Sequence, residues 1–151
     1  MLDTLETIKA TAGRVLGVDF GDVRTGLAVS DEARFLAQGI GYLRVPGLAK
    51  AAAAVAEEAT ARGVGAIIVG LPVNMNGTHG PRAEHAVAFA EALREAAGLP
   101  VATFDERMTT MAAARYLNDT NTRGKNRKAV IDTLSAQIIL QNALDRMKNM
   151  A

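Results

Sequence analysis

Short apolar segments alternate along this chain with segments of helical periodicity. The first is Val15–Phe20, where apolar residues occupy both sets of alternating positions. This pattern predicts a strand that is covered on both faces. Thr25–Ser30 and Gln38–Leu43 follow as further strands, and the glycines make the last one weaker. Because the connections are short, we expect these three strands to pair in antiparallel fashion.

The middle of the chain continues as helix, strand, helix, strand. Apolar residues at helical spacing predict helices over Leu48–Arg62 and from about Ala83 to Ala97. Ala66–Leu71 is a fully apolar strand, and the short strand Val101–Phe104 follows the second helix. The residues of Pro72–Thr78 favour turns, so we expect a loop there.

The last part of the chain predicts two more helices. One starts after Thr109, a suitable N-cap residue. The stretch Asn121–Arg127 breaks the pattern, and a final helix starts near Ile131 and ends at about Met147. This order predicts an α/β fold with a mixed five-stranded sheet flanked by helices. We expect one domain at residues 13–148, after an N-terminal extension at 1–12 that is loose or forms a short helix.

Composition narrows the class of protein. With 151 residues, 49% of them hydrophobic and 22% charged, the chain is expected to fold alone as a globular domain. The net charge of +1 means that binding to nucleic acid would need a local cluster of cations. The chain has no cysteine, which excludes disulfides and thiolate metal sites. No apolar run of 18 residues or signal peptide is present, so we expect a cytoplasmic protein and no membrane contact.

Asp19 is the most informative single residue. An ionised carboxylate in an apolar strand is costly unless it is paired, hydrogen-bonded or bound to metal. A simple alternative is that Asp19 accepts hydrogen bonds from the following turn at Gly21–Asp22.

Two more acids follow at positions that suit a site. Glu106 comes directly after the strand Val101–Phe104, and open α/β sheets bind ligands at such carboxyl ends. Asp132 lies in the first turns of the last helix. A surface ion pair with Arg107, or a place at the start of a helix, could also explain Glu106, and a weak pair with Lys128 could explain Asp132. Together, however, three acids of this kind form the oxygen-ligand set that Mg²⁺ or Mn²⁺ requires. Two such ions about 3.5 to 4 Å apart can promote in-line displacement at a phosphate.

A basic segment precedes Asp132. The residues 120–128 contain four cations and no acid, which predicts a loop that contacts phosphates, although a solvated surface loop is the alternative. His79 and His85 lack partners at metal-ligand spacing, so we assign them no catalytic role. Asp19–Gly21 matches a kinase tripeptide by chance, because the other kinase motifs are absent.

The motifs occur in the order found in a known family. They are Gly17–Gly21 with Arg24–Asp31, Gly70–Pro72 with Asn74–Gly77, Asp105–Arg107 with Thr109–Thr110, and Lys128 with Ile131–Asp132. The chain resembles the YqgF family over residues 14–145. Members of that family are described as Holliday-junction resolvases and as nucleases of the 16S ribosomal RNA precursor.

The resemblance implies a ribonuclease-H-like fold, a cytoplasmic location in bacteria and a metal-binding triad of Asp19, Glu106 and Asp132. It also implies that the loop from Gly70 to Gly77 and the basic loop lie near the substrate. The candidate substrate-binding residues are therefore Arg24, Asn74, Asn76, Arg107, Arg123, Lys125, Arg127 and Lys128.

The leading hypothesis is a metal-dependent nuclease that processes the 5′ end of pre-16S rRNA, with RNA or DNA as partner and either a monomer or a homodimer as the assembly. One alternative is a Holliday-junction or single-stranded DNA nuclease in recombination and repair. A second is a non-catalytic RNA-binding module, which the complete acidic triad disfavours. A phosphate-binding kinase of the actin type begins with a similar hairpin, but the chain has no second copy of it.

Overall fold

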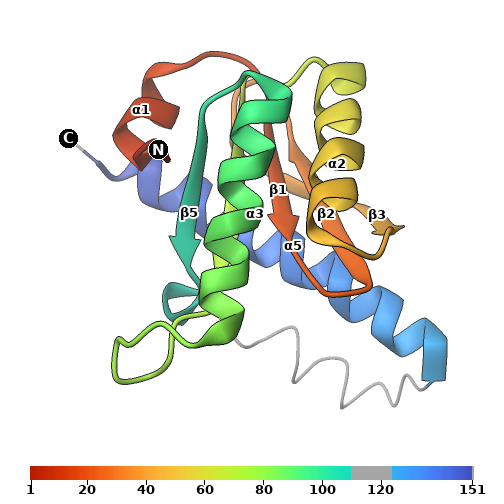
Figure 1. Ribbon diagram of the computed structural model, residues 1–151. Helices are drawn as coiled ribbons and strands as arrows, with labels where there is room; N and C mark the ends of the chain where they lie inside the picture. Colours follow the sequence, from red (N-terminus) through yellow and green to blue (C-terminus); the bar gives the residue numbers. More distant parts are fainter. Residues whose placement is uncertain (110–123, 151) are drawn as a thin grey trace.

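Five strands form one mixed sheet in the order β3-β2-β1-β4-β5 in the computed structural model (Figure 1). The structure describes residues 1–109 and 124–150, and in the second range the side chains from Thr133 onward. β1 pairs antiparallel with β2, and β2 with β3, whereas β1, β4 and β5 run parallel. The predicted α/β class with three antiparallel strands first is therefore confirmed. The strands are β1 Val15–Asp19, β2 Arg24–Ser30, β3 Ala37–Arg44, β4 Ala66–Leu71 and β5 Val101–Asp105.

Helices cover both faces of the sheet. α2 (Leu48–Arg62) and α3 (Pro81–Ala97) lie side by side on one face, and α5 (Gly124–Lys148) crosses the other (Figure 1). The predicted bounds of α2 are confirmed, and α3 begins two residues before the expected Ala83 because Pro81 suits a first helical turn. None of the described helices combines the length and apolar character that a membrane crossing requires.

The two faces of the sheet are packed differently. On the α2–α3 face, large side chains such as Val18, Val55 and Phe89 form the core, and the rings of Phe20 and Phe89 stack with centroids 4.3 Å apart. On the α5 face, glycine lets the helix approach closely. A Cβ on Gly17 would lie 2.6 Å from Leu140 Cβ, which is closer than van der Waals contact allows. The α5 backbone therefore passes directly over β1.

The first dozen residues are more firmly held than a loose extension would be. Leu5–Ala10 forms the short helix α1, as the alternative prediction had it, and Ile8 is fully buried against the α5 face. The Asp3 amide donates to the Val101 carbonyl at 2.8 Å, and its carboxylate accepts from Arg94 Nε at 2.8 Å. These contacts join the N-terminus to β5.

One prediction on the last third of the chain needs correction. α5 begins at Gly124, so Lys125, Arg127 and Lys128 belong to a helix and not to a loop. These residues have good helix propensity, and the lack of apolar positions was a poor reason to expect a break. Thr109 follows the 3-10 helix η1 (Glu106–Met108) as its C-cap in extended conformation. The helix predicted after Thr109, together with Arg123, lies outside the described residues.

Candidate active site

Asp19 and Glu106 approach each other over the α5 face of the sheet. Gly17 faces α5, so Asp19, two residues further along β1, is on the same face. Val18 pairs with Val69, so the next residue of each strand brings Asp19 level with Gly70. A Cβ on Gly70 would lie 3.1 Å from Glu106 Oε2. Because neighbouring strands are about 4.8 Å apart, the two carboxylates occupy adjacent positions.

Glu106 is held in an apolar setting. Its carboxylate lies beside Ile139, whose Cδ1 would be 2.5 Å from a Cβ on Gly70. Burial raises the pKa of Glu106, the positive charge of Arg82 lowers it in part, and Asp105 adds to the increase. Among the described residues, no hydrogen bond to the Glu106 carboxylate is found. A cation would stabilise the ionised form of this half-buried carboxylate.

The neighbouring Asp105 has the opposite environment. It makes a two-pronged ion pair with Arg107, whose Nη2 lies 2.7 Å and whose Nε lies 3.0 Å from Oδ2. The hydrogen bonds from the Arg107 side chain hold the pKa of Asp105 below its usual range. The ion pair considered for Glu106 therefore involves Asp105 instead. It leaves the Glu106 carboxylate facing the sheet.

Arg107 also reaches the loop after β4. Its Nη1 donates to the Met75 carbonyl at 3.4 Å, near the upper limit for a hydrogen bond. Within the loop, Asn74 Nδ2 donates to Thr78 Oγ1 at 3.0 Å, and that hydroxyl donates to Asn76 Oδ1 at 2.6 Å. Asn74, Asn76 and Arg107 thus lie at the same end of the sheet as Glu106, and all three make contacts within the protein.

The third predicted acid, Asp132, belongs to α5. Asp132 lies on the helix one residue before Thr133, and Thr133 packs over Gly39 of β3. The Asp132 side chain is outside the described set, as are those of Lys125, Arg127 and Lys128. Arg24 begins β2, at the sheet end where β1 finishes. Asp19 and Arg24 each take part in interactions within the chain.

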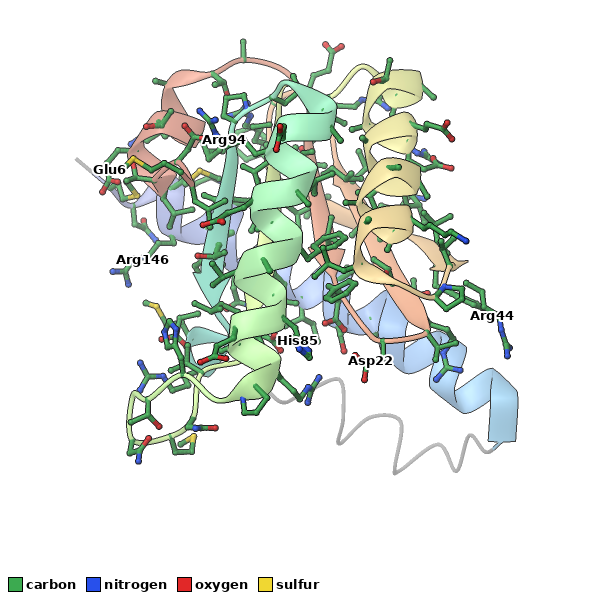
Figure 2. All side chains as sticks on the ribbon, in the orientation of Figure 1. Glu6, Asp22, Arg44, His85, Arg94 and Arg146 are labelled. Atoms are coloured by element: carbon green, nitrogen blue, oxygen red, sulfur yellow. The ribbon has the colours of Figure 1, made fainter. Side chains whose placement is uncertain are left out.

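Three residues at this end were not singled out from the sequence for the site. Arg82, in the first turn of α3, places its charge near Glu106. Figure 2 shows His85 of α3 and Asp22 of the β1–β2 turn at this same end of the molecule. Neither residue has a sequence motif, because their position depends on how α3 packs against the sheet.

The residues present suit a hard divalent cation in their chemistry. Asp19 and Glu106 supply carboxylate oxygens, and a cation would stabilise the ionised form of the half-buried Glu106 carboxylate. Among the described side chains, no group of three acidic or imidazole ligands is close enough to hold an ion. A complete site would therefore depend on Asp132 as its third carboxylate.

Comparison with known proteins gives consistent results. The model of the family described as "RuvX: Holliday junction resolvase" matches residues 13–146. A protein of Caldanaerobacter subterraneus subsp. tengcongensis named "Putative pre-16S rRNA nuclease" is 46% identical over 138 residues, covering 90% of this chain and 99% of its own. One of the same name from Moorella thermoacetica is 45% identical, covering 89% and 96%.

Solved structures support the same fold. RuvC of T. thermophilus in complex with a Holliday junction substrate superposes with a TM-score of 0.58 at 18% identity, covering 91% of this chain and 96% of that one. A second T. thermophilus RuvC structure gives 0.55. This likeness shows a ribonuclease-H-like fold of the RuvC type. The family match spans nearly the whole chain and includes Asp19 and Glu106, and the chain belongs to the RuvX family of Holliday junction resolvases.

Proposed function

We propose that this chain is a divalent-metal-dependent nuclease that processes the 5′ end of pre-16S rRNA in the cytoplasm. The observation that carries the proposal is the pair of carboxylates at adjacent strand positions, Asp19 and Glu106, of which Glu106 is half-buried and has no hydrogen bond among the described residues. Partial burial of a carboxylate without a hydrogen bond is costly, and such groups are candidates for functional sites. The names of relatives at about 45% identity support the choice of substrate.

Asp19, Glu106 and Asp132 would hold the cations. Mg²⁺ or Mn²⁺ at this site, with two ions expected, would activate water and stabilise the leaving oxygen of a phosphodiester. The protein's own contribution is to fix the carboxylates. β1 ends at Asp19, η1 starts at Glu106, and Asp105 is held away from the site by Arg107. Only one of the two neighbouring acids is therefore available to a cation.

Cations around the acids would bind the nucleic acid backbone. Lys125, Arg127 and Lys128 lie in the first turns of α5, and Arg123 comes just before it. Arg24 starts β2 beside the end of β1. Asn74, Asn76 and Arg107 would act indirectly, by shaping the loop after β4 that borders Glu106. Phosphate contacts of this kind position a substrate without reading its sequence.

A second candidate function is cleavage of branched DNA. The description of the family model favours it. A non-catalytic RNA-binding role is the outcome to be accepted if no cleavage is found.

The test is cleavage of three labelled substrates under identical conditions: the 5′ region of pre-16S rRNA, a four-way DNA junction and single-stranded DNA. We expect cleavage of the RNA with Mg²⁺ or Mn²⁺ and none with EDTA. Asp19→Asn, Glu106→Gln and Asp132→Asn should each lower the rate by orders of magnitude with little change in folding. Their effects should be non-additive, because the residues act as a unit.

Asp22→Asn is the matched control. Asp22 is exposed at the same end of the molecule, and its substitution removes the same charge (Figure 2). It should leave the rate unchanged. Cleavage of the junction alone would move the assignment to the second candidate. Near-normal cleavage by any of the three acid variants would remove that residue from the set.

A further inference from the structure

A β-bulge turns the end of β3 toward the face that carries the acids. Ala28 pairs with Gly39 but Leu27 pairs with Gly41, so Ile40 is an extra residue. Gly41 has φ of 112°, a conformation that favours glycine. A shift of one residue exchanges the faces of all following side chains. Without the bulge, Tyr42 would face α2; with it, Tyr42 and Arg44 share the face of Asp19.

Register places Tyr42 in the row of Asp19. Asp19 pairs with Gly26, and Gly26 pairs with Tyr42. Directly paired residues point to the same face, and two strand spacings amount to about 10 Å. The Tyr42 side chain therefore lies about 10 Å from that of Asp19, with a residue that has no side chain between them.

The Tyr42 ring is available to a ligand. The residue is 41% exposed, and among the described residues its side chain has no hydrogen bond or ring contact. Tyrosine is common in strands, so its presence in β3 alone carries no functional meaning. In another register, however, the ring would lie on the opposite face of β3, which α2 covers. The bulge instead presents the ring beside the acids. Bulges frequently redirect side chains next to active sites.

Arg24 and Arg44 lie one row further along the same face of the sheet as Tyr42. Arg24 and Arg44 are directly paired across β2 and β3, so their side chains share the face of Tyr42. Like charges in this position are destabilising. Arg44 is exposed and makes no ion pair with any described residue; Figure 2 shows it projecting from the sheet near the first half of α5. A phosphate that contacts both guanidinium groups would accept charge-assisted hydrogen bonds from them.

We propose that Tyr42, Arg24 and Arg44, which we call the β3 surface, bind the single strand next to the cleaved bond. One unpaired base stacks on Tyr42, and the arginines hold a backbone phosphate. Stacking on a protein ring requires an unpaired base, so the flank of the substrate is single-stranded. The inference rests on the proposed nuclease function and adds to it the form of the substrate.

Tyrosine fluorescence gives a direct test, because the chain has no tryptophan and its only other tyrosine is Tyr116. The Tyr116→Phe protein then reports on Tyr42 alone. It is titrated in EDTA, which prevents metal-dependent cleavage, with a single-stranded RNA of about 12 nucleotides. Anisotropy of a labelled copy of the RNA reports saturation independently. We expect the emission to be quenched as RNA binds, and unchanged emission at saturation overturns the stacking.

Substitutions separate the ring from general packing. Tyr42→Leu should raise the Kd for this RNA by about 5- to 150-fold, the usual range for one stacked base. Tyr42→Phe keeps the ring and should bind nearly as wild type. Arg44→Gln should reduce the log-log salt slope of binding by about 0.7, as for one lost phosphate contact. The matched control is Arg146→Gln, an exposed arginine at the far end of the molecule, which should keep the wild-type slope (Figure 2).

A duplex RNA of equal length completes the test. We expect weaker binding than for the single strand, and no sensitivity to Tyr42→Leu. Equal effects of Tyr42→Leu and Tyr42→Phe, or unchanged binding in Tyr42→Leu and Arg44→Gln while wild type cleaves normally, would refute the β3 surface alone. Intact quenching and binding without cleavage by wild type would refute the proposed nuclease and leave the β3 surface standing.

Discussion

The two ends of the sheet differ in how far their polar groups are hydrogen-bonded within the chain. At the end where β1 begins, Arg34 donates to the Gly13 and Ile8 carbonyls and to Thr11 Oγ1 at 2.7 to 2.8 Å. Ser30 Oγ accepts from the Val15 amide at 2.9 Å. The Arg34 guanidinium and the Ser30 hydroxyl thus have partners inside the chain. We call this end the closed end of the sheet, because these polar side chains are hydrogen-bonded within the chain.

At the end where β1 finishes, several polar groups lack partners among the described residues. The half-buried Glu106 carboxylate has no hydrogen bond from the described residues, and the exposed Arg44 makes no ion pair with any of them. In the part of the chain that the structure describes, the single buried side-chain atom without a hydrogen-bond partner is Thr25 Oγ1, at this same end. Unsatisfied groups cost stability. Their concentration at one end indicates that this end is organised for ligands.

The largest effect on stability should come from the closed end. Arg34→Ala removes three hydrogen bonds from a charged donor and should lower the free energy of unfolding by about 2 to 4 kcal/mol. For a chain of this size, the melting temperature should fall by roughly 4 to 16 °C. Cleavage per folded molecule at low temperature should not change, since the acids lie at the other end.

Arg14→Ala is the control for Arg34→Ala. Arg14 is exposed near the same end, and its loss should change the free energy of unfolding by less than about 0.5 kcal/mol. Equal melting temperatures of the Arg34 and Arg14 variants would show that the closed end does not stabilise the fold as described.

A substitution under Glu106 should have the reverse effect. In Gly70→Ala the new Cβ would meet Ile139 Cδ1 at 2.5 Å and Glu106 Oε2 at 3.1 Å. The flexible Ile139 side chain can move, but displacing the carboxylate by a fraction of an ångström should slow cleavage by up to about 100-fold. Steady-state kinetics should show the loss in kcat, with RNA affinity nearly unchanged.

The double variant Gly70→Ala/Ile139→Val separates packing from chemistry. Valine lacks Cδ1, so the closest clash disappears and the melting temperature should be at least that of Gly70→Ala. The contact with Glu106 remains, so the slow rate should persist. Recovery of the rate together with stability would mean that Gly70 is needed only for packing of α5.

The sequence predicted the strands well because each β-strand shows its burial in its own residues. Ala66–Leu71 is apolar throughout, and the structure buries all six residues. Asp19 and Glu106 could also be selected, since an acid at the end of a buried strand is unusual. The close approach of α5 to Gly17 could not be predicted from the glycine itself, because it depends on Leu140, which is over 100 residues away in the chain.

What the sequence could not predict depends on register and on partners. The pairing of Arg107 with Asp105, and not with Glu106, is decided by side-chain directions at the start of η1. Tyr42 faces the acids only because of the bulge at Ile40. The start of α5 was misjudged because Lys125 to Lys128 are helix formers without an apolar stripe, so periodicity could not detect them.

The smallest predicted effect compares the neighbouring acids Asp105 and Glu106 by their pH dependence. Burial raises the pKa of Glu106 above its ordinary value of 4.5. The ionised form therefore destabilises the fold once the pH exceeds the pKa that Glu106 has in the unfolded chain. In EDTA at neutral pH, Glu106→Gln should therefore melt above wild type, and the gain should vanish near pH 4. The pKa of Asp105 lies below 3.8, so its charge stabilises the fold above that value. Asp105→Asn should melt below wild type at neutral pH, by an amount within the range of about 0 to 1 kcal/mol for an exposed ion pair, and the deficit should shrink as the pH falls below 3.8. Thermal melting of the three proteins from pH 3 to 8 checks both signs, and shifts of the same sign at neutral pH would contradict the contrast between the two carboxylates.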